Sequence, residues 1–247
     1  MPLYLRPAAR APGPGLFAEL HHEEANLEQV TQQGTAVRVA SPSALLYRVT
    51  KRSFDLVAAG LGLVVLSPLL LLVAVGILID GGLPILYRCQ RVGRFGRPIT
   101  VVKFRTMHDG SHHHLKELLT LDEEKRLEYV ATRKLREDPR RTRFGILLRR
   151  TSLDELPQLL NVLSGDMSIV GPRPYLESEL SERPEGADIL SVRPGITGLW
   201  QVSGRSDLTF AERLAFDMEY IRKRGVRQDV SILSRTIGAV VSGRGAY

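Results

Sequence analysis

The sequence predicts an α+β protein that is mainly helical and associates with a membrane through one apolar segment. Three observations carry this prediction. Residues 56–79 contain no charged side chain, residues 85–107 alternate as strands do, and leucines recur at helical spacing in residues 151–174. The 247 residues suffice for one domain with an appendage, and the single cysteine excludes an intrachain disulfide.

The first fifty residues predict little structure. Residues 1–15 are rich in proline, glycine and alanine without an apolar run, which is typical of disorder and not of a signal peptide. His21 and His22 lack cysteine partners and helical ligand spacing, so a solvated stretch is favoured over a metal site. Residues 35–39 predict a short strand. We therefore expect residues 1–50 to form a largely disordered extension.

The apolar segment, residues 56–79, is long enough to cross a hydrocarbon core about 30 Å thick. Ser67 and Pro68 lie at its midpoint. Proline removes a helix hydrogen bond, so two half-helices with a bend fit as well as one straight helix, and the Ser67 hydroxyl could satisfy a backbone group freed at the bend.

Basic residues flank this segment on both sides, and basic residues favour the cytoplasmic side of a membrane. They are Arg38, Arg48, Lys51 and Arg52 before it, and Arg88, Arg91, Arg94 and Arg97 after it. A re-entrant hairpin, which enters and leaves one leaflet, accounts for both the bend and the charges. A single crossing and a buried helix of a soluble protein are the alternatives.

Residues 85–107 predict a β-hairpin punctuated by Gly93, Gly96 and Pro98. Lys103 and Arg105 are two apart on a strand and share one face, where they could neutralise a diphosphate. The alternative is an electrostatic grip on anionic lipid headgroups, worth about 1 kcal/mol per residue, which suits the arginines nearer the membrane.

Residues 109–136 predict charged helices. The run His112-His113-His114 is more typical of a solvated loop than of a zinc site, because no acid or cysteine accompanies it. Residues 133–150 hold eight basic and two acidic side chains. Such a block could bind nucleic acid, but it lacks interleaved aromatic residues, so a membrane surface and an anionic substrate are the favoured partners.

Residues 151–174 combine acids, a helix and a basic turn. Four leucines form one apolar helix face: Leu153, Leu156, Leu160 and Leu163. Asp154, Gln158 and Asn161 point away from this face. Asp154 and Glu155 lie near the helix start, where the macrodipole keeps a carboxylate ionised as nucleophile or metal ligand. For Glu155 a capping box with Ser152 is an equal alternative.

The rest of this stretch predicts a helix end at Gly165, a short strand and a rigid turn. Arg173 stands between two prolines, so its backbone has little freedom, as suits a clamp on phosphate. A stiff surface turn with a solvated arginine is the alternative.

Beyond it, residues 193–205 predict a loop whose glycines, Gly195, Gly198 and Gly204, permit close approach to a ligand. Trp200 could stack on a base or sugar, or could be buried among tight turns. Residues 209–221 predict an amphipathic helix, on which Asp217 is a supporting acid or an ion-pair partner. Residues 230–241 are apolar enough to lie on a membrane or to cap the core.

Several of these stretches together resemble the monotopic phosphoglycosyl transferases, bacterial sugar transferases that act on polyprenyl phosphate. The resemblance covers residues 51–247 and rests on KRSFDLVAAGLGLVVLSPLLLLV, VVKFRTM, DPRRTRFG, LRRTSLDELPQLLNVLSGDMSIVGPRP, RPGITGLWQVSGR and GRGAY. It implies the re-entrant form of the membrane helix in residues 51–80 and a catalytic domain in residues 81–247 at the cytoplasmic face of the inner membrane.

The resemblance also implies an activity. A sugar 1-phosphate, of a hexose such as galactose or glucose, would pass from a UDP-sugar to undecaprenyl phosphate with release of UMP, as a first step of exopolysaccharide or other surface-glycan synthesis. No residue selects one sugar. A homo-oligomer is allowed and no nucleic-acid partner is expected. A basic lipid- or nucleic-acid-binding module without catalysis and a lipid-phosphate hydrolase are the alternatives.

The implied roles fall on particular residues. Asp154 would form a phosphosugar aspartate and, with Glu155, hold Mg²⁺; Glu155 could instead accept the acceptor's proton. Arg173, Lys103 and Arg105 would neutralise the diphosphate. A donor-binding loop would use Arg193, Gly198, Trp200, Gln201 and Arg205.

Overall fold

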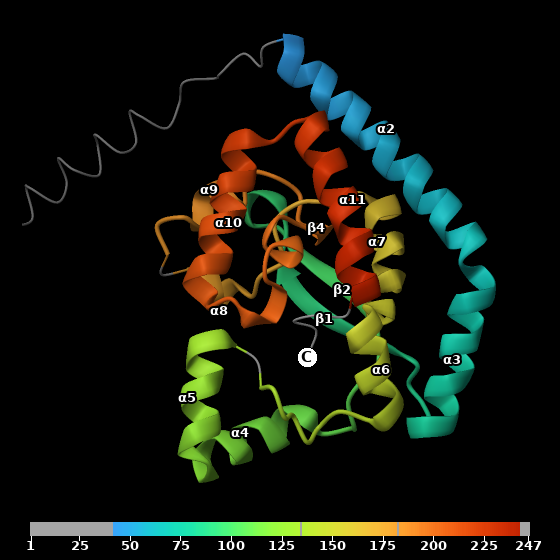
Figure 1. The fold of residues 1–247 in the computed structure, drawn as a ribbon, viewed down its shortest axis with the longest axis vertical. Coiled ribbons are helices and arrows are strands. Elements are labelled where there is room, and N and C mark those ends of the chain that lie inside the picture. Colours follow the sequence, from blue (N-terminus) through green and yellow to red (C-terminus); the bar gives the residue numbers. More distant parts are fainter. Residues whose placement is uncertain (1–41, 134, 182, 243–247) are drawn as a thin grey trace, which may run out of the picture. The chain divides into compact units, whose positions relative to one another are not determined.

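A computed structural model describes residues 42–133, 135–181 and 183–242. Residues from Leu46 onward form one compact unit, and the elements of this unit are shown in Figure 1. The expected disorder of residues 1–15, the histidines at 21 and 22 and the strand at 35–39 lie outside the described residues.

The described elements confirm a mainly helical α+β fold. In chain order they are α2 (Pro42–Val65), α3 (Ser67–Gly81), β1 (Leu86–Val92), the 3-10 helix η1 (Arg94–Gly96), β2 (Pro98–Phe104), α4 (Ser111–Leu121), α5 (Glu123–Thr132), α6 (Arg143–Thr151), η2 (Leu153–Gln158), α7 (Leu159–Ser164), β3 (Ser168–Val170), α8 (Glu177–Leu180), α9 (Gly186–Ile189), β4 (Gly195–Thr197), η3 (Trp200–Val202), η4 (Arg205–Asp207), α10 (Phe210–Lys223) and α11 (Val226–Ser242).

The predicted hairpin is confirmed. Strands β1 and β2 pair antiparallel, with Leu86 opposite Phe104 and Val92 opposite Pro98. The hairpin packs on α7 and α2 through a core that includes Val101, Val162 and Ala59. Its position places the end of β2 against the turn that carries the acid pair.

The apolar segment is broken at the predicted place. Helices α2 and α3 meet at a bend of 62°, with Pro68 in the first turn of α3. The Val64 carbonyl would normally accept the N–H of residue 68, which proline lacks, and the Ser67 hydroxyl donates to that carbonyl at 2.7 Å instead. The hydroxyl therefore satisfies the backbone group that the bend frees, as expected.

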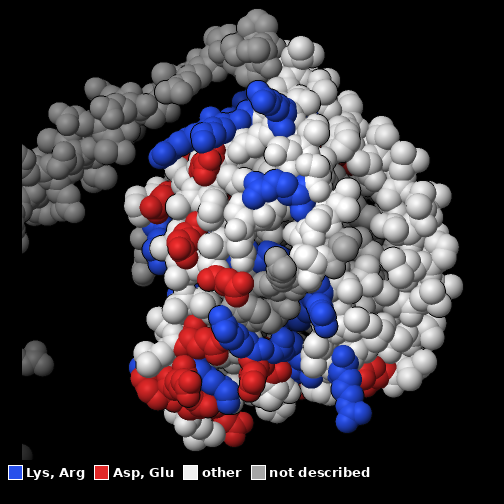
Figure 2. Space-filling view, in the orientation of Figure 1, with Lys and Arg blue, Asp and Glu red and all other residues white. Residues whose placement is uncertain are grey.

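By length and hydropathy, no single helix among the described residues qualifies as a membrane span, whereas the bent α2–α3 pair does when taken together. Its outer surface is apolar, with Val64 and Ile79 72% and 84% exposed. On the face shown in Figure 2, the surface over α2 and α3 is almost free of charged side chains up to the end of α3.

The polar side of α2 holds this helix to the rest of the unit. Arg52 donates to the Val162 and Leu163 carbonyls at the end of α7, and buried Asp55 accepts the N–H of Ile169 in β3. Lys51 pairs with Asp229 of α11 at 3.1 Å. One face of α2 is thus bound to the body of the protein, while the other remains apolar and exposed.

Helices α4, α10 and α11 agree with the sequence-based predictions except at the histidine run. Thr209 and Glu212 form a capping box at the start of α10, and Ile232 of α11 is buried in the core, so α11 caps the core. The histidine run at 112–114 was expected in a loop, but it lies in the first turn of α4, which Gly110 precedes.

The glycines of the loop around β4 approach the protein's own backbone. A Cβ on Gly195 would lie 2.1 Å from the Gly171 nitrogen, and one on Gly198 2.4 Å from the Gly171 oxygen. This close contact allows β3 and β4 to pair in parallel. These two glycines are therefore needed for the close approach to Gly171, while the approach of Gly195 and Gly198 to a ligand stays a prediction.

Candidate active site

The predicted single helix of residues 153–164 is two elements. Residues 153–158 form the 3-10 helix η2, with Pro157 inside it, and α7 begins at Leu159. Proline cannot donate to the carbonyl four residues earlier, which excludes a regular α-helix through this point. Gly165 ends α7 in the left-handed conformation, as predicted, with φ 92°.

The expected leucine face is directed outward at its C-terminal half. Leu160 and Leu163 are 50% and 37% exposed, whereas Asn161 is buried. The Asn161 side chain accepts the N–H of Val102 and donates to the Thr100 carbonyl at 2.7 Å, which fixes α7 to β2. A polar residue thus holds α7, and with it the preceding turn that carries the acid pair, against the hairpin.

The two acids occupy different environments. Asp154 is buried, 8% exposed, and burial followed by the charge of Glu155 raises its pKa to about 6; Lys103 and Arg149 act in the opposite direction. Glu155 accepts a hydrogen bond from the Lys103 Nζ at 2.7 Å. Because burial alone disfavours the charged form, the neighbouring cations are what keep Asp154 ionised at neutral pH.

The alternative of a capping box for Glu155 is not realised. Ser152 adopts a positive φ of 58° and makes no capping hydrogen bond with its side chain. Its Oγ instead accepts from the Arg205 Nη2 at 2.7 Å. Ser152 and Glu155 are thus each bound to a cation from another part of the chain.

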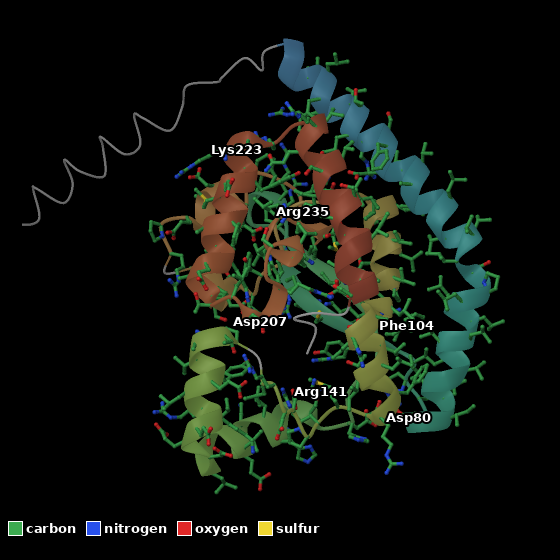
Figure 3. All side chains as sticks on the ribbon, in the orientation of Figure 1. Asp80, Phe104, Arg141, Asp207, Lys223 and Arg235 are labelled. Carbon is green, nitrogen blue, oxygen red and sulfur yellow. The ribbon has the colours of Figure 1, made fainter. Side chains whose placement is uncertain are left out.

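Both acids line a cleft of about 800 Å³. Its lining has an excess of positive charge. Three carboxylates line it, those of Asp109, Asp154 and Glu155, together with seven cationic side chains: Arg91, Lys103, Arg105, Arg140, Arg149, Arg173 and Arg205. Figure 3 labels Phe104, another lining residue, at the end of β2. A cleft of this size and charge suits a ligand that carries several phosphates.

Arg105 lines the cleft but also has a structural role. Its guanidinium donates to the carbonyls of Gly81, Gly82 and Leu83, where α3 ends, and to the Asp109 Oδ1 at 3.1 Å. Lys103, in contrast, is directed to Glu155. The two residues share the cleft as predicted, while binding of phosphate by either stays a prediction.

Arg173 is held by its backbone and stacks on an indole. Its N–H donates to the Asp217 Oδ2 at 3.3 Å, and the Tyr175 hydroxyl donates to the same oxygen at 2.8 Å. The guanidinium lies 5.8 Å from the centre of the Trp200 ring. Asp217 is fully buried, and burial raises its pKa to about 7. It therefore acts as the supporting acid expected in α10.

Trp200 is buried among tight turns, which was the alternative to stacking on a base or sugar. It is 2% exposed and lies between Arg173 and Arg213, whose guanidinium is 5.1 Å from the ring centre. Of the expected donor-binding loop, Trp200, Gln201 and Arg205 line the cleft. Arg193 does not line it and donates to the Gly165 carbonyl at 2.8 Å.

Arg149 is a cleft residue that the sequence patterns did not single out. Its Nε donates to the Thr106 Oγ1 at 2.9 Å, and its charge lowers the pKa of Asp154. Burial lowers the pKa of Arg149 itself. Within the sequence it was one of many cations in residues 133–150, and its only distinguishing signal was its place in the helix directly before the acid pair.

The chain belongs to the bacterial sugar transferase family, whose model matches residues 46–243. It is accordingly an enzyme, a sugar-phosphate transferase, which excludes the alternative of a binding module without catalysis.

Among its relatives is the exopolysaccharide production protein ExoY of Rhizobium meliloti, 44% identical over 200 residues that cover 81% of this chain and 88% of ExoY. The undecaprenyl-phosphate galactose phosphotransferase of Salmonella typhimurium is 45% identical over 201 residues, covering 81% of this chain but 42% of that protein. The UDP-glucose:undecaprenyl-phosphate glucose-1-phosphate transferase of Escherichia coli is 37% identical over 216 residues, covering 84% and 43%.

Proposed function

We propose that this enzyme transfers a hexose 1-phosphate from a UDP-sugar to undecaprenyl phosphate and releases UMP, as an initiating step of exopolysaccharide synthesis. The relatives named for galactose and glucose transfer support the substrate classes. The observation that carries the proposal is a buried carboxylate, Asp154, in a cleft with seven cationic side chains. That arrangement serves a reaction between two phosphorylated substrates.

The reaction proceeds in two displacements. An Asp154 oxygen attacks the β-phosphorus of the donor; a bond from carboxylate oxygen to phosphorus forms, and the bond to the bridging oxygen breaks with release of UMP. A phosphate oxygen of undecaprenyl phosphate then attacks the same phosphorus and expels Asp154 as a free carboxylate. Lys103, Arg149 and Arg173 lie in the cleft to neutralise the phosphate charges.

Asp154 and Glu155 fit a Mg²⁺ ion by donor chemistry. Among residues 42–133, 135–181 and 183–242, no group of three or more His, Cys, Asp or Glu side chains could hold a metal by itself. Mg²⁺ is commonly held by one or two carboxylates together with substrate phosphates, which matches two adjacent acids in a diphosphate site. When bound, it would offset the charge of an anion attacking an anion.

We further propose that the α2–α3 pair is re-entrant and holds the enzyme on the cytoplasmic leaflet. A bend with its freed carbonyl satisfied by Ser67, an apolar exposed face and basic residues at both ends support this topology. The arrangement has a chemical purpose, since a lipid-bound phosphate does not leave the membrane interface.

The decisive experiment measures nucleoside monophosphate release from the detergent-solubilised enzyme given UDP-sugars and Mg²⁺ without acceptor. We expect a stoichiometric burst with one donor, and a loss of at least about 1000-fold in Asp154→Asn. Asp166→Asn is the matched control, because Asp166 accepts from Ser164 at the end of α7 and does not line the cleft. A burst that survives in Asp154→Asn would overturn the assignment of the nucleophile. Release of inorganic phosphate instead of nucleotide would favour a hydrolase.

A further inference from the structure

The exposed apolar surface and the cleft meet at one side chain. Many large apolar side chains of the described residues are exposed, nearly half of them on α2 and α3. Tyr87 of β1, 40% exposed, is the one among them that also lines the cleft. Pro84, which precedes β1, lines the cleft as well, and the adjacent Leu83 is 72% exposed.

This position lies where the apolar segment ends. Helix α3 ends at Gly81 and β1 begins at Leu86, so residues 83–87 are the first part of the chain after the bent pair. Arg105 fixes this connection to the cleft through its hydrogen bond to the Leu83 carbonyl at 3.0 Å. Pro84 therefore brings the lining of the cleft to within three residues of the C-terminal end of α3.

The polar groups that face Tyr87 suit a lipid phosphate. Tyr87 is directly opposite Lys103 in the hairpin register, and Lys103 contacts Glu155 of the acid pair. Arg91, four residues further along β1, is on the same face and also lines the cleft. An apolar ring thus lies beside Lys103, which contacts the acid pair, and a second cation lines the cleft on the same face of β1. Aromatic residues with a polar tip are typical of membrane interfaces.

We infer that Tyr87 is a binding residue for the acceptor, which packs on the first isoprene units of the polyprenyl chain while the phosphate lies among Lys103 and Arg91. Leu83 and Pro84 continue this contact toward the bilayer. The inference rests on the proposed function and adds to it a path by which the lipid enters. Because the donor needs no apolar chain, Tyr87 serves the second displacement and not the first.

The test separates the two displacements in the full-length enzyme. For Tyr87→Ser we expect a KM for undecaprenyl phosphate about tenfold higher, because apolar contact area is lost, with the acceptor-free nucleotide burst within about twofold of the unsubstituted enzyme. Tyr87→Phe retains the ring and should restore the acceptor KM. Leu121→Ser is the matched control, since Leu121 is 78% exposed at the end of α4 and does not line the cleft.

An unchanged acceptor KM in Tyr87→Ser would overturn the inference. So would an equal loss in the burst, because Tyr87 would then support the site as a whole. If the unsubstituted enzyme releases no nucleotide from any donor, the proposed function fails, and that failure is distinguishable because it precedes any substitution.

Discussion

Proline interrupts a helical run in two regions of this enzyme, with different results. Pro68 separates two long α-helices, and the outcome is a 62° bend whose freed carbonyl is satisfied by the neighbouring Ser67. Pro157 lies in a six-residue 3-10 helix that follows the left-handed Ser152, and the outcome is a tight turn. Consecutive residues of a 3-10 helix are about 120° apart, so Asp154 is buried while its neighbour Glu155 reaches Lys103, and both side chains line the cleft.

Different groups support the two breaks. In the α2–α3 pair a hydroxyl next to the proline is enough, because the one unsatisfied group is local. In the cleft the turn of the acid pair is held from outside by ionic groups, with Lys103 on Glu155 and Arg205 on Ser152. Substitutions at the two sites should therefore affect different properties: reaction rate at the acid pair and stability at the bend.

After replacement of Asp154 itself, the largest effect is expected for Lys103→Met. Loss of this charge removes a group that lowers the pKa of Asp154, so that pKa rises above about 6 and less of this carboxyl group, the proposed nucleophile, is ionised at pH 7. Because the substitution also removes a charge proposed to neutralise the donor phosphates, we expect the acceptor-free burst rate at pH 7 to fall about 100-fold. We also expect the acidic limb of its pH–rate profile to move to higher pH. Lys103→Arg keeps the charge and should leave the acidic limb of the pH–rate profile at its original pH. A limb that does not move in Lys103→Met would show that Lys103 does not tune Asp154.

The Pro-Arg-Pro turn is a third proline-containing segment, and a buried acid holds it. Burial raises the pKa of Asp217 from its ordinary value of 3.8 to about 7, so the folded state favours the protonated form. The stability contribution is therefore lost as pH rises from about 4 to about 7. Asp217→Asn should keep the acceptor for Tyr175 and remove the charge. Its free energy of unfolding, measured relative to that of the unsubstituted enzyme, should therefore be about 2 kcal/mol higher at pH 8 than at pH 5.

Denaturant unfolding in detergent at the two pH values measures this. Asp217→Ala is the companion variant, because it also removes the acceptor for the Arg173 N–H and should raise the donor KM several-fold. An Asp217→Asn variant whose stability changes with pH in parallel with that of the unsubstituted enzyme would contradict the prediction.

An intermediate effect is expected for Pro157→Ala. Alanine supplies the N–H that proline lacks, so α7 can extend backward through residues 153–157 and turn the two acids to the α-helical separation of about 100°. We expect kcat to fall about tenfold with little change in the unfolding midpoint. Pro98→Ala, at the start of β2, is the matched control. An unchanged kcat together with an α-helical 153–157 would show that the 3-10 turn is not needed for catalysis.

Local patterns predicted much of this structure. The hairpin, the break at Ser67-Pro68 and the helix predicted for residues 209–221 each depend on neighbours in sequence, so the residues alone indicate them. The leucine spacing also predicted a helix across residue 157, but a proline inside a periodic run competes with that pattern and prevailed.

Long-range partners of the site were harder to predict. Arg105 looked like a phosphate ligand because it shares a face with Lys103, yet it also binds carbonyls at the end of α3, which no local pattern shows. Arg149 was one cation among many until the fold placed it beside Asp154. Trp200 is buried by arginines from other segments. Such partners depend on tertiary packing, on which periodicity carries no information.

The smallest effect tests the bend itself through a double-mutant cycle. Ser67→Ala leaves the Val64 carbonyl without its donor and should lower the free energy of unfolding by about 1 kcal/mol. In a Pro68→Ala background the new N–H can satisfy that carbonyl, so the same Ser67→Ala substitution should cost almost nothing. Thermal unfolding of the four proteins in one detergent gives the coupling energy, and Ser53→Ala, in α2 and away from the bend, controls for loss of a hydroxyl. Equal costs in both backgrounds would mean that the hydroxyl does not compensate for the proline, and the contrast with the ionic support at Pro157 would no longer hold.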